Sequence, residues 1–445
     1  MADIPHNVED KRLDDSNKWE VGIIGAGDMG ILYATKFSSA GYKVNICDLP
    51  SKYDDLVEKY KDTKWTIMRD GFAVSRRSDL IIYSVEAVNI DKVVKEYGKA
   101  TKVGAVVAGQ TSVKEPEIKA FEAYLPEDVH IITCHSLHGP NVDTEGQPLV
   151  VIRHRSDDYC YNQTLEVFKC LKSQMVFLGY KEHDRITADT QAATHLAYLS
   201  LGTAWKTQGY HPWENPQFIA GIDNVKIGMA LRIYASKYHV YAGLAIMNPA
   251  AKTQLRHYVD ALTMLYKMMV GGKDKEFTDL VYKAADFVFG KSRDKKQILL
   301  SDELLDRYSL SQVPKENRLP NSQLSLLATA VCWYNMKTNP YDSLICQTPP
   351  FRLWLGIVEY LFCNAELLKE SVEAALNDRY TQAEDLVFYS AVTSWGSCIQ
   401  LGSFDGYREM FEETAAFFKD RLVEGKDLST QMINEITRKI KPNVS

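Results

Sequence analysis

The segment Val21-Gly22-Ile23-Ile24-Gly25-Ala26-Gly27-Asp28-Met29-Gly30 places three glycines, in the order G-x-G-x-x-G, directly after an apolar run. The run Trp19–Ile24 predicts a buried strand, and the pattern Met29–Ala40, which stops before Gly41, predicts a helix. Between them, the first glycine permits a tight turn, the second lets the backbone approach a pyrophosphate, and the third lets helix and strand pack closely. Phosphates bind well at a helix N-terminus because free N–H groups and the helix dipole favour anions. The segment therefore predicts a dinucleotide-binding Rossmann domain.

The residues after the next predicted strand, Lys43–Cys47, bear on the choice of dinucleotide. Asp48 ends this strand, where an acid normally accepts a hydrogen bond from the ribose 2′-OH and repels a 2′-phosphate, which favours NAD. Ser51 and Lys52 come soon after and would hold a 2′-phosphate if Asp48 turns aside, which favours NADP. The residues alone leave this choice open. The expected cofactor-binding residues are Gly25, Gly27, Asp28, Met29, Gly30, Asp48, Ser51, Lys52, Ser84 and Val85.

The pattern of apolar residues in the sequence changes near Ile186. Before it, short Val- and Ile-rich runs alternate with helical patterns, which predicts a parallel sheet wrapped by helices. After it, apolar residues recur at helical spacing, which predicts an all-helical domain. We therefore expect a polar tail (1–17), a Rossmann domain (18–185) and a helical domain (186–445). Tyr238–Gly243 is similar to Phe351–Gly356, which leaves open whether the helical domain is duplicated (about 186–300 and 320–445) or the similarity is chance.

Composition excludes several classes of function. The 445 residues carry a net charge of -6, which argues against nucleic acid as a partner. No apolar run approaches the roughly 18 residues of a membrane span, and the segment Met1–Lys18 has no apolar core of a secretory signal. The 8 cysteines include no C-x-x-C pair, so we expect reduced, buried thiols rather than disulfides or metal ligands. The sequence predicts a cytoplasmic protein without a metal ion.

Two polar segments come directly after predicted strands of the sheet. They are Gly109-Gln-Thr-Ser-Val-Lys114 and Cys134-His-Ser-Leu-His-Gly-Pro140. Ligands bind open α/β sheets at the C-terminal ends of the strands, so both segments are well placed for catalysis. His135 is a candidate general base, and Ser112 would orient the imidazole and the substrate. The alternatives are a helix N-cap at Ser112, with Glu115 as its capping-box partner, and an ordinary loop histidine at position 135.

Taken together, these motifs resemble prephenate dehydrogenase. The resemblance rests on the glycine segment, on the G-Q-T-S-V-K and H-S-L-H-G-P segments, and on E-H-D-R-I-T-A-D-T-Q-A-A-T-H-L at 182–196. It is greatest to the long, fungal, NADP-linked enzymes of tyrosine biosynthesis. The resemblance implies a 6-phosphogluconate-dehydrogenase-like architecture and the oxidative decarboxylation of prephenate to 4-hydroxyphenylpyruvate, with hydride transfer to NADP. Arogenate dehydrogenase and a non-catalytic NAD(P)-sensing regulator are the alternatives.

The resemblance also implies roles for individual residues. The essential histidine of the family matches His135 and its serine matches Ser112, whereas the His183–Asp184 pair is interpreted as a structural start to the helical domain. Prephenate is a dianion, so its site needs cations. In bacterial relatives an arginine holds a carboxylate of the substrate. That arginine aligns near Tyr360 of this chain, which offers no cation for this role. The expected substrate-binding residues are Ser112, His135, Asn141, Thr194, His195, Arg232, Lys237 and Arg352. Because relatives pair through the helical region, we also expect a symmetric homodimer built on this domain.

Overall fold

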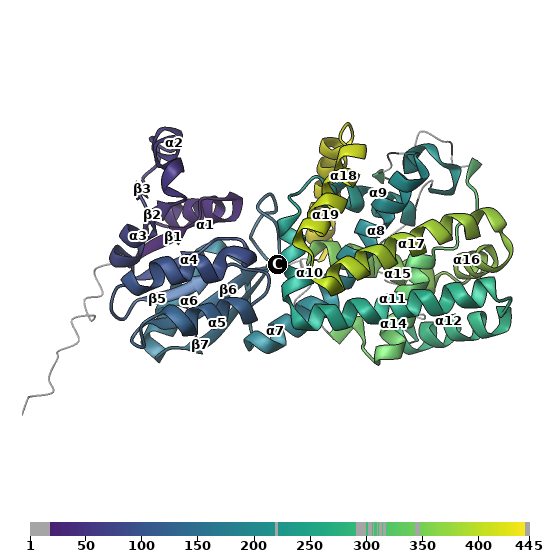
Figure 1. Ribbon diagram of the computed structural model, residues 1–445, viewed down its shortest axis with the longest axis horizontal. Helices are drawn as coiled ribbons and strands as arrows, with labels where there is room; N and C mark the ends of the chain where they lie inside the picture. The colour runs from purple at the N-terminus through teal and green to yellow at the C-terminus, as the bar shows by residue number, and fades with distance from the viewer. Residues whose placement is uncertain are drawn as a thin grey trace, which may run out of the picture.

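The computed structural model describes residues 18–218, 221–290, 317–342 and 348–440, and six single residues between positions 300 and 314. The side chains of 436–440 are not described, and the predicted polar tail, 1–17, lies outside the described residues. Two bodies lie side by side, a sheet covered by helices and a larger body made of helices alone (Figure 1).

The first body is built on an 8-stranded sheet in the order β3-β2-β1-β4-β5-β6-β7-β8. All neighbouring strands run parallel except β6 and β7, which are antiparallel. The strands are β1 (Glu20–Ile24), β2 (Lys43–Cys47), β3 (Thr66–Ile67), β4 (Leu80–Tyr83), β5 (Val106–Gly109), β6 (His130–Ser136), β7 (Pro148–Arg155) and β8 (Gln174–Phe177).

Helices cover both faces of this sheet, because successive apolar residues of a buried strand point to opposite faces. One face packs around Tyr33 and Phe37, and the other around Val94 and Phe121. The main helices are α1 (Asp28–Ser39), α2 (Tyr53–Lys59), α3 (Gly71–Arg77), α4 (Ile90–Tyr97), α5 (Glu115–Tyr124) and α6 (Asp158–Phe168).

One continuous helical path leads from the sheet into the second body. It consists of α7 (Tyr180–Thr187), a π-helical stretch (Ala188–Ala192) and α8 (Ala193–Gln208). A π-helical stretch adds a residue to a turn and often marks a functional site. The path therefore joins the end of the sheet to the centre of the helical body, and α7 lies at the junction in Figure 1.

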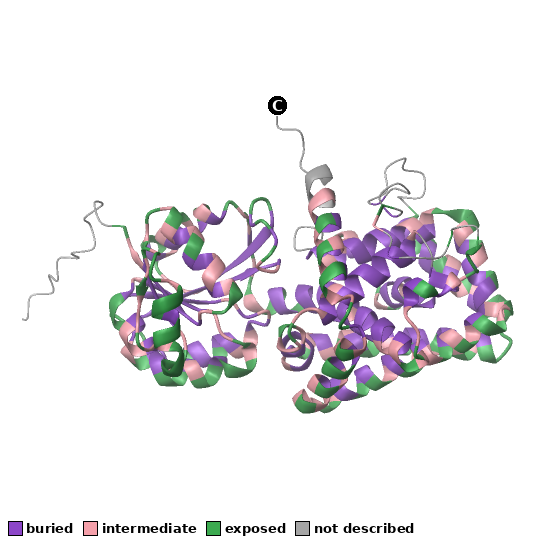
Figure 2. Ribbon diagram, turned by 90° about the horizontal axis from the view of Figure 1, so that it is seen from above, coloured by how far each residue is buried: buried purple, intermediate pink, exposed green. Residues whose placement is uncertain are grey.

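The second body has one continuous core that extends from Ala188 to Ile433 and includes the fully buried Trp354 and Trp395. Figure 2 shows buried residues on the inward faces of its helices and along the strands of the sheet. Its further helices are α9 (Ile222–Tyr234), α10 (His239–Met247), α11 (Pro249–Val270), α12 (Asp274–Phe289), α14 (Leu324–Met336), α15 (Pro349–Cys363), α16 (Ala365–Asn377), α17 (Arg379–Leu401), α18 (Phe404–Phe417) and α19 (Leu422–Ile440).

The predicted order of a Rossmann domain followed by an all-helical domain is confirmed. Among the helices that the structure describes, none has the length and apolar character needed to cross a membrane.

Candidate active site

The glycine segment forms the turn between β1 and α1. Gly25 has a φ of 111°, and a Cβ added there would lie 2.2 Å from the carbonyl oxygen of Ser84. A Cβ on Gly30 would lie 2.1 Å from the carbonyl oxygen of Gly25, whereas a Cβ on Gly27 would meet no atom within 4 Å. Two of the glycines are thus required by close packing, and the space over Gly27 is open.

The N-terminus of α1 opens onto this space. Gly27 is the N-cap and gives no side-chain cap to the helix. Asp28 is exposed and Met29 is half-buried. The first N–H groups of a helix lack intrahelical acceptors, so this turn suits the pyrophosphate of a dinucleotide.

The carboxylate of Asp48 is already held by its neighbours. Its Oδ2 accepts a hydrogen bond of 3.0 Å from the N–H of Ala26, and its Oδ1 accepts one of 2.7 Å from the N–H of Leu49. Lys52 Nζ lies 3.1 Å from the same Oδ1. Ser51 and Lys52 are both exposed on the short 3-10 helix Pro50–Lys52.

Ser84 and Val85 come directly after β4 and lie against the glycine turn. The Ser84 hydroxyl donates to Gln110 Oε1 over 2.7 Å. A Cβ on Gly25 would be 3.3 Å from Val85 Cγ1. The predicted cofactor residues therefore lie on the turn itself and on the ends of β2 and β4, which are the two strands that flank β1.

A series of hydrogen bonds ends at the candidate base. His135, near the end of β6, has its Nδ1 2.8 Å from His183 Nε2. His183 Nδ1 is in turn 2.8 Å from Asp184 Oδ1. The interpretation of His183–Asp184 as a purely structural start to the helical domain was thus incomplete, because α7 delivers this pair directly to the imidazole of His135.

Asp184 also caps α5. Its Oδ1 accepts a hydrogen bond of 2.7 Å from the N–H of Lys114, and its Oδ2 accepts one of 2.8 Å from the N–H of Glu115. The alternative of a cap by Ser112 is wrong, since Lys114 is the N-cap and provides no side-chain cap. Ser112 is half-buried, and among the hydrogen bonds of the described residues none joins it to His135.

A buried lysine fixes the backbone beneath His135. Lys114 Nζ donates hydrogen bonds of 2.6 Å to the carbonyl oxygen of Cys134 and 3.1 Å to that of Gly109, and it lies 2.9 Å from Glu117 Oε1. All of this ion pair is buried. The S-V-K segment contains this lysine, but no local pattern in the sequence indicates that its ammonium group faces the strand that carries His135.

Burial holds the pKa of His135 well below its usual value of 6.5, and the neighbouring His183, Lys114 and His138 lower it further. Burial likewise holds the pKa of His183 well below 6.5, with Lys114 adding to the effect. Both imidazoles are therefore neutral at neutral pH, which is the state that a general base requires.

A second cluster lies in the helical domain. The ring of His195, on α8, contacts the ring of Tyr241, on α10, with centroids 4.8 Å apart. The guanidinium of Arg232, on α9, is near enough to Tyr241 to lower the pKa of its phenol, although burial raises that pKa more. Arg232 Nη1 donates a hydrogen bond of 2.5 Å to Thr430 Oγ1 on α19. The cluster combines a cation, a phenol and an imidazole, which suits an anionic ligand.

The remaining predicted substrate residues do not join this cluster through any bond between described residues. Asn141 and Lys237 are exposed. The Thr194 hydroxyl donates to the carbonyl oxygen of Thr190, one turn earlier, so its proton is used within the helix. Arg352 is half-buried on α15, and burial lowers the pKa of its guanidinium.

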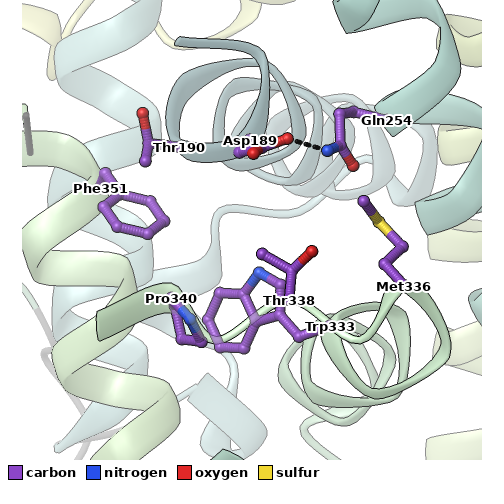
Figure 3. Close-up of a pocket in the computed structure, with 8 residues that line it drawn as sticks. All are labelled: Asp189, Thr190, Gln254, Trp333, Met336, Thr338, Pro340 and Phe351. Atoms are coloured by element: carbon purple, nitrogen blue, oxygen red, sulfur yellow. Dashed lines mark hydrogen bonds between the residues drawn. The ribbon is translucent and has the colours of Figure 1, made fainter. Parts of the chain in front are cut away.

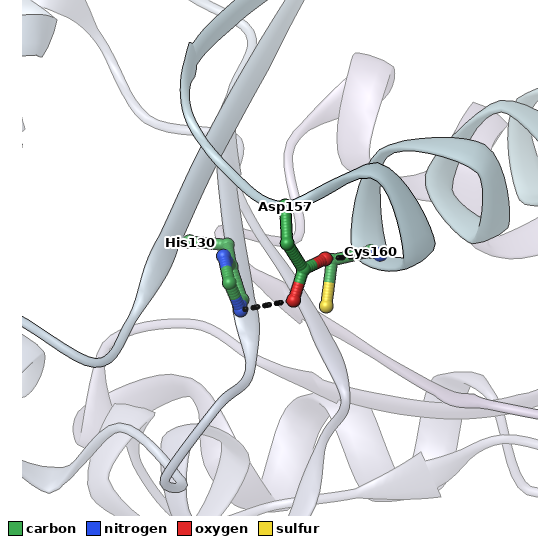
Figure 4. Close-up of side chains that lie close together, drawn as sticks. All are labelled: His130, Asp157 and Cys160. Atoms are coloured by element: carbon green, nitrogen blue, oxygen red, sulfur yellow. Dashed lines mark hydrogen bonds and ion pairs between the residues drawn. The ribbon is translucent and has the colours of Figure 1, made fainter. Parts of the chain in front are cut away.

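Two other groupings are separate from these clusters. A small pocket inside the helical domain has Asp189 hydrogen-bonded to Gln254 on its wall, with Phe351 opposite (Figure 3). At the start of β6, His130 Nε2 lies 3.6 Å from Asp157 Oδ2, and Cys160 is beside them (Figure 4). Asp157 is the N-cap of α6, so its carboxylate already has a structural partner.

Two family models match parts of this chain. Residues 192–438 match a family model described as a 6-phosphogluconate dehydrogenase C-terminal domain, and residues 20–108 match the model described as NADP oxidoreductase coenzyme F420-dependent. The chain is 48% identical over 420 residues to the probable prephenate dehydrogenase (NADP+) of Schizosaccharomyces pombe, a match that covers 94% of this chain and 97% of the relative. The chain belongs to the prephenate dehydrogenase family.

Other members of the family show its range. The prephenate dehydrogenase (NADP+) of Saccharomyces cerevisiae is 48% identical over 427 residues, which cover 94% of this chain and 93% of that protein. The probable arogenate/prephenate dehydrogenase of Methanocaldococcus jannaschii is 25% identical over 304 residues, 67% of each chain. The family and the 6-phosphogluconate-dehydrogenase-like helical domain expected from the sequence are thus confirmed.

Proposed function

We propose that this protein is an NADP-dependent prephenate dehydrogenase of tyrosine biosynthesis, which converts prephenate to 4-hydroxyphenylpyruvate and CO2. The observation that carries the proposal is the hydrogen-bonded series Asp184–His183–His135, which ends at the C-terminal end of β6 in a chain 48% identical to enzymes named for this activity. Such a series holds an imidazole in one tautomer, and burial keeps it neutral, as proton abstraction from a hydroxyl group requires.

The series assigns the reactive nitrogen. An ionised Asp184 accepts only, so His183 carries its proton on Nδ1 and presents a lone pair at Nε2. His135 Nδ1 then donates to that lone pair, which leaves His135 Nε2 unprotonated. We assign His135 Nε2 as the base that takes the proton of the C4 hydroxyl of prephenate.

The reaction moves one proton through His135 and removes a hydride and CO2 from prephenate. NADP+ held at the turn around Gly27 would supply the acceptor for the hydride of C4. The C1–carboxylate bond breaks as CO2 leaves, and its electron pair makes the ring aromatic. His135 returns its proton to the phenolate oxygen, so the reaction releases no net proton. Ser112 is assigned to hold the C4 hydroxyl next to His135, a role that its place after β5 permits.

The residues present fit NADP. The open space over Gly27 and the uncapped start of α1 would receive the pyrophosphate. The Asp48 carboxylate already has Ala26, Leu49 and Lys52 as partners, and the exposed Ser51 and Lys52 would hold the 2′-phosphate. Gly27→Val should fill that space, so stabilisation of the fold by NADP should disappear in this variant.

For the substrate, we assign Arg232 to a carboxylate of prephenate, with His195 and Tyr241 around it. Roles for Asn141, Thr194, Lys237 and Arg352 stay predictions. The cytoplasmic location also stays a prediction. Burial, which raises the pKa of the Cys47 and Cys134 thiols to about 12, agrees with the inert thiols expected of a reducing compartment.

The test is an assay of NADPH and NADH formation with prephenate and, separately, with arogenate. The proposal expects prephenate-dependent NADPH formation and little reaction with arogenate. A preference for arogenate would assign the enzyme to the other substrate of the family. Tight binding of NADP without turnover of either compound would favour a non-catalytic NADP sensor.

A further inference from the structure

Two long helices of the helical domain begin with the same cap, 130 positions apart. Asn248 is the N-cap of α11, and its Oδ1 accepts hydrogen bonds from the N–H groups of Ala250 and Ala251. Asp378 is the N-cap of α17, and its Oδ1 accepts from the N–H groups two and three residues later, those of Tyr380 and Thr381. A shared cap fixes the register between two helices far better than apolar spacing does, because it occurs at one position only.

The same shift relates the ends of these helices and the helices that come next. Gly272 and Gly402, 130 positions apart, both adopt the left-handed conformation, with φ of 62° and 73°. Each precedes the next helix, α12 or α18. The buried positions also coincide at this shift, and the pairs are Tyr258 with Phe388, Leu262 with Val392, Leu265 with Trp395, Met269 with Ile399, Phe277 with Tyr407, and Val281 with Phe411.

Helices α8 and α14 also correspond, and their matching residues are 128 positions apart. Each ends in a left-handed residue, Gly209 with a φ of 76° and Lys337 with a φ of 56°. The buried Trp205 and Trp333 stand at equal distances before these ends. Short 3-10 turns begin at Pro212 and Pro340, again at the same shift.

Contacts between these helices correspond to contacts between their counterparts. Helix α8 packs on α17, as α14 packs on α11, and α18 packs on α8, as α12 packs on α14. Where α11 crosses α17, the rings of Tyr266 and Tyr389 stack with centroids 5.0 Å apart. The residue 130 positions after Tyr266 is Gly396, and the residue 130 positions before Tyr389 is Val259. A Cβ on Gly396 would lie 3.0 Å from Val259 Cγ2. Positions that exchange under the shift of 130 are therefore in contact on both sides of the crossing.

We propose that the helical domain is two copies of one helical unit, α8–α12 and α14–α18, and that the second copy is the partner surface of the first. The second unit then gives, within one chain, the pairing that a second subunit would give. This inference replaces the repeat register suggested by Tyr238–Gly243 and Phe351–Gly356. It also opposes the homodimer expected from the sequence, and it does not depend on the proposed reaction.

The two units have diverged where the first carries the candidate substrate cluster. The counterpart of His195 is Gln323, which donates hydrogen bonds of 3.2 Å to the carboxylate of Asp223 and accepts one from Lys226. All three of these groups are buried. The counterpart of Tyr241 is Ser371, so the aromatic contact with an imidazole is absent from the described residues of the second unit. Within the part of the chain that the structure describes, the second unit therefore lacks a copy of the candidate substrate cluster.

The first experiment is light scattering of the full chain from about 0.1 to 50 µM, with Tm measured over the same range. We expect a mass near the 50.5 kDa of one chain and a Tm that does not depend on concentration. Exposed leucines on α17 serve as matched probes of any outer interface, and Leu386→Glu and Leu401→Glu should change neither mass nor Tm. A mass of about two chains within this range would overturn the proposal, and a fall of that mass in either leucine variant would place the interface on α17.

The second experiment tests the contact between the units. Gly396→Val should lower Tm, because even the first carbon of the added side chain would lie 3.0 Å from Val259 Cγ2 and a branched side chain needs more room. Val259→Ala should restore most of that loss in the double variant, and this coupling should be the same at every protein concentration. Additive effects of the two substitutions, or a coupling that appears only at high concentration, would contradict packing of the two units within one chain. Neither measurement uses substrate, so failure of the proposed reaction would leave this result unchanged.

Discussion

His183 Nε2 lies 2.8 Å from His135 Nδ1, although the two residues are 48 positions apart. The contact joins the end of β6 to α7, which is the first helix of the helical path between the two domains. A base that is held in this way depends on the relative position of the domains, so its activity should respond to changes on either side of the contact.

Replacing His135 tests the assignment of the base directly. His135→Asn should lower kcat by about 10²- to 10⁴-fold, which is the usual contribution of general acid–base catalysis. The KM for prephenate should change much less. Steady-state kinetics with saturating NADP measure both constants. His138→Asn is the matched control, because His138 lies three residues later and bonds only its neighbour Gly139 among the described residues. A normal kcat in His135→Asn, or an equal loss in the control, would refute the assignment.

The pH profile should reflect the burial of this imidazole. Burial and the neighbouring charges keep the pKa of His135 well below 6.5, so the base stays unprotonated as the pH falls through 6.5. We expect kcat/KM to fall on the acid side with a midpoint below 6.5, since this ratio reports the free enzyme. The folded state also loses stability below about pH 6.5, because unfolded histidine binds protons that the buried neutral rings do not. An acid limb centred above 6.5 would contradict the assignment.

Asp184 should act through His183 on the tautomer of His135. In Asp184→Ala, no carboxylate would hold the proton of His183 on Nδ1, so His183 could carry it on Nε2, and His135 Nε2 would then carry the proton that it should accept. We expect kcat to fall by about 10²-fold or more, in line with the large effect of a wrong tautomer in catalytic triads. Circular dichroism and NADP affinity should stay close to those of the unmodified enzyme. A loss of NADP binding would show that the cap on α5, rather than the tautomer, is what Asp184 provides.

The sequence predicted the local features and missed those that depend on distant contacts. The glycine turn and the strand that carries His135 could be predicted because they depend on residues next to one another. The cap of α5 could not, because its acceptor Asp184 comes 70 positions after Lys114 and matches no local capping pattern. The similarity of Tyr238–Gly243 to Phe351–Gly356 gives a shift different from the 130 that we propose, for a related reason. Amphipathic helices match one another at several shifts, and only the caps at Asn248 and Asp378 fix the shift of 130.

The cofactor preference should depend on Lys52. Lys52→Ala removes the proposed cation for the 2′-phosphate and frees Asp48, which lies 3.1 Å away. The KM for NADP should rise by about tenfold, the low end for a charged hydrogen bond at an exposed site, and the KM for NAD should stay equal or fall. Lys59→Ala, on the adjacent helix α2, is the control and should change neither constant. A parallel rise for both cofactors would mean that Lys52 does not contact the 2′-phosphate.

Binding of the substrate should depend on Arg232 and on the residue that orients the Arg232 guanidinium. A carboxylate that the reaction leaves unchanged is bound equally in the ground state and the transition state, so losing its partner raises KM and preserves kcat. Arg232→Gln should therefore raise the KM for prephenate by about 10- to 150-fold, which corresponds to a charged hydrogen bond of about 1.5–3 kcal/mol. Lys237→Gln and Arg352→Gln, which remove the other two candidate cations, are the comparison and should stay near normal.

Thr430 adds a finer test of the same site. Its hydroxyl donates to the carbonyl oxygen of Lys426 over 2.7 Å, so its lone pairs face Arg232 and accept the 2.5 Å hydrogen bond from Nη1. Thr430→Val removes this acceptor and leaves Arg232 free to turn, so KM should rise severalfold with kcat kept, whereas Thr430→Ser should behave normally. If the serine variant fails like the valine variant, packing of α19 on α9 is what matters. If Arg232→Gln itself keeps a normal KM, the carboxylates of prephenate are held by other residues.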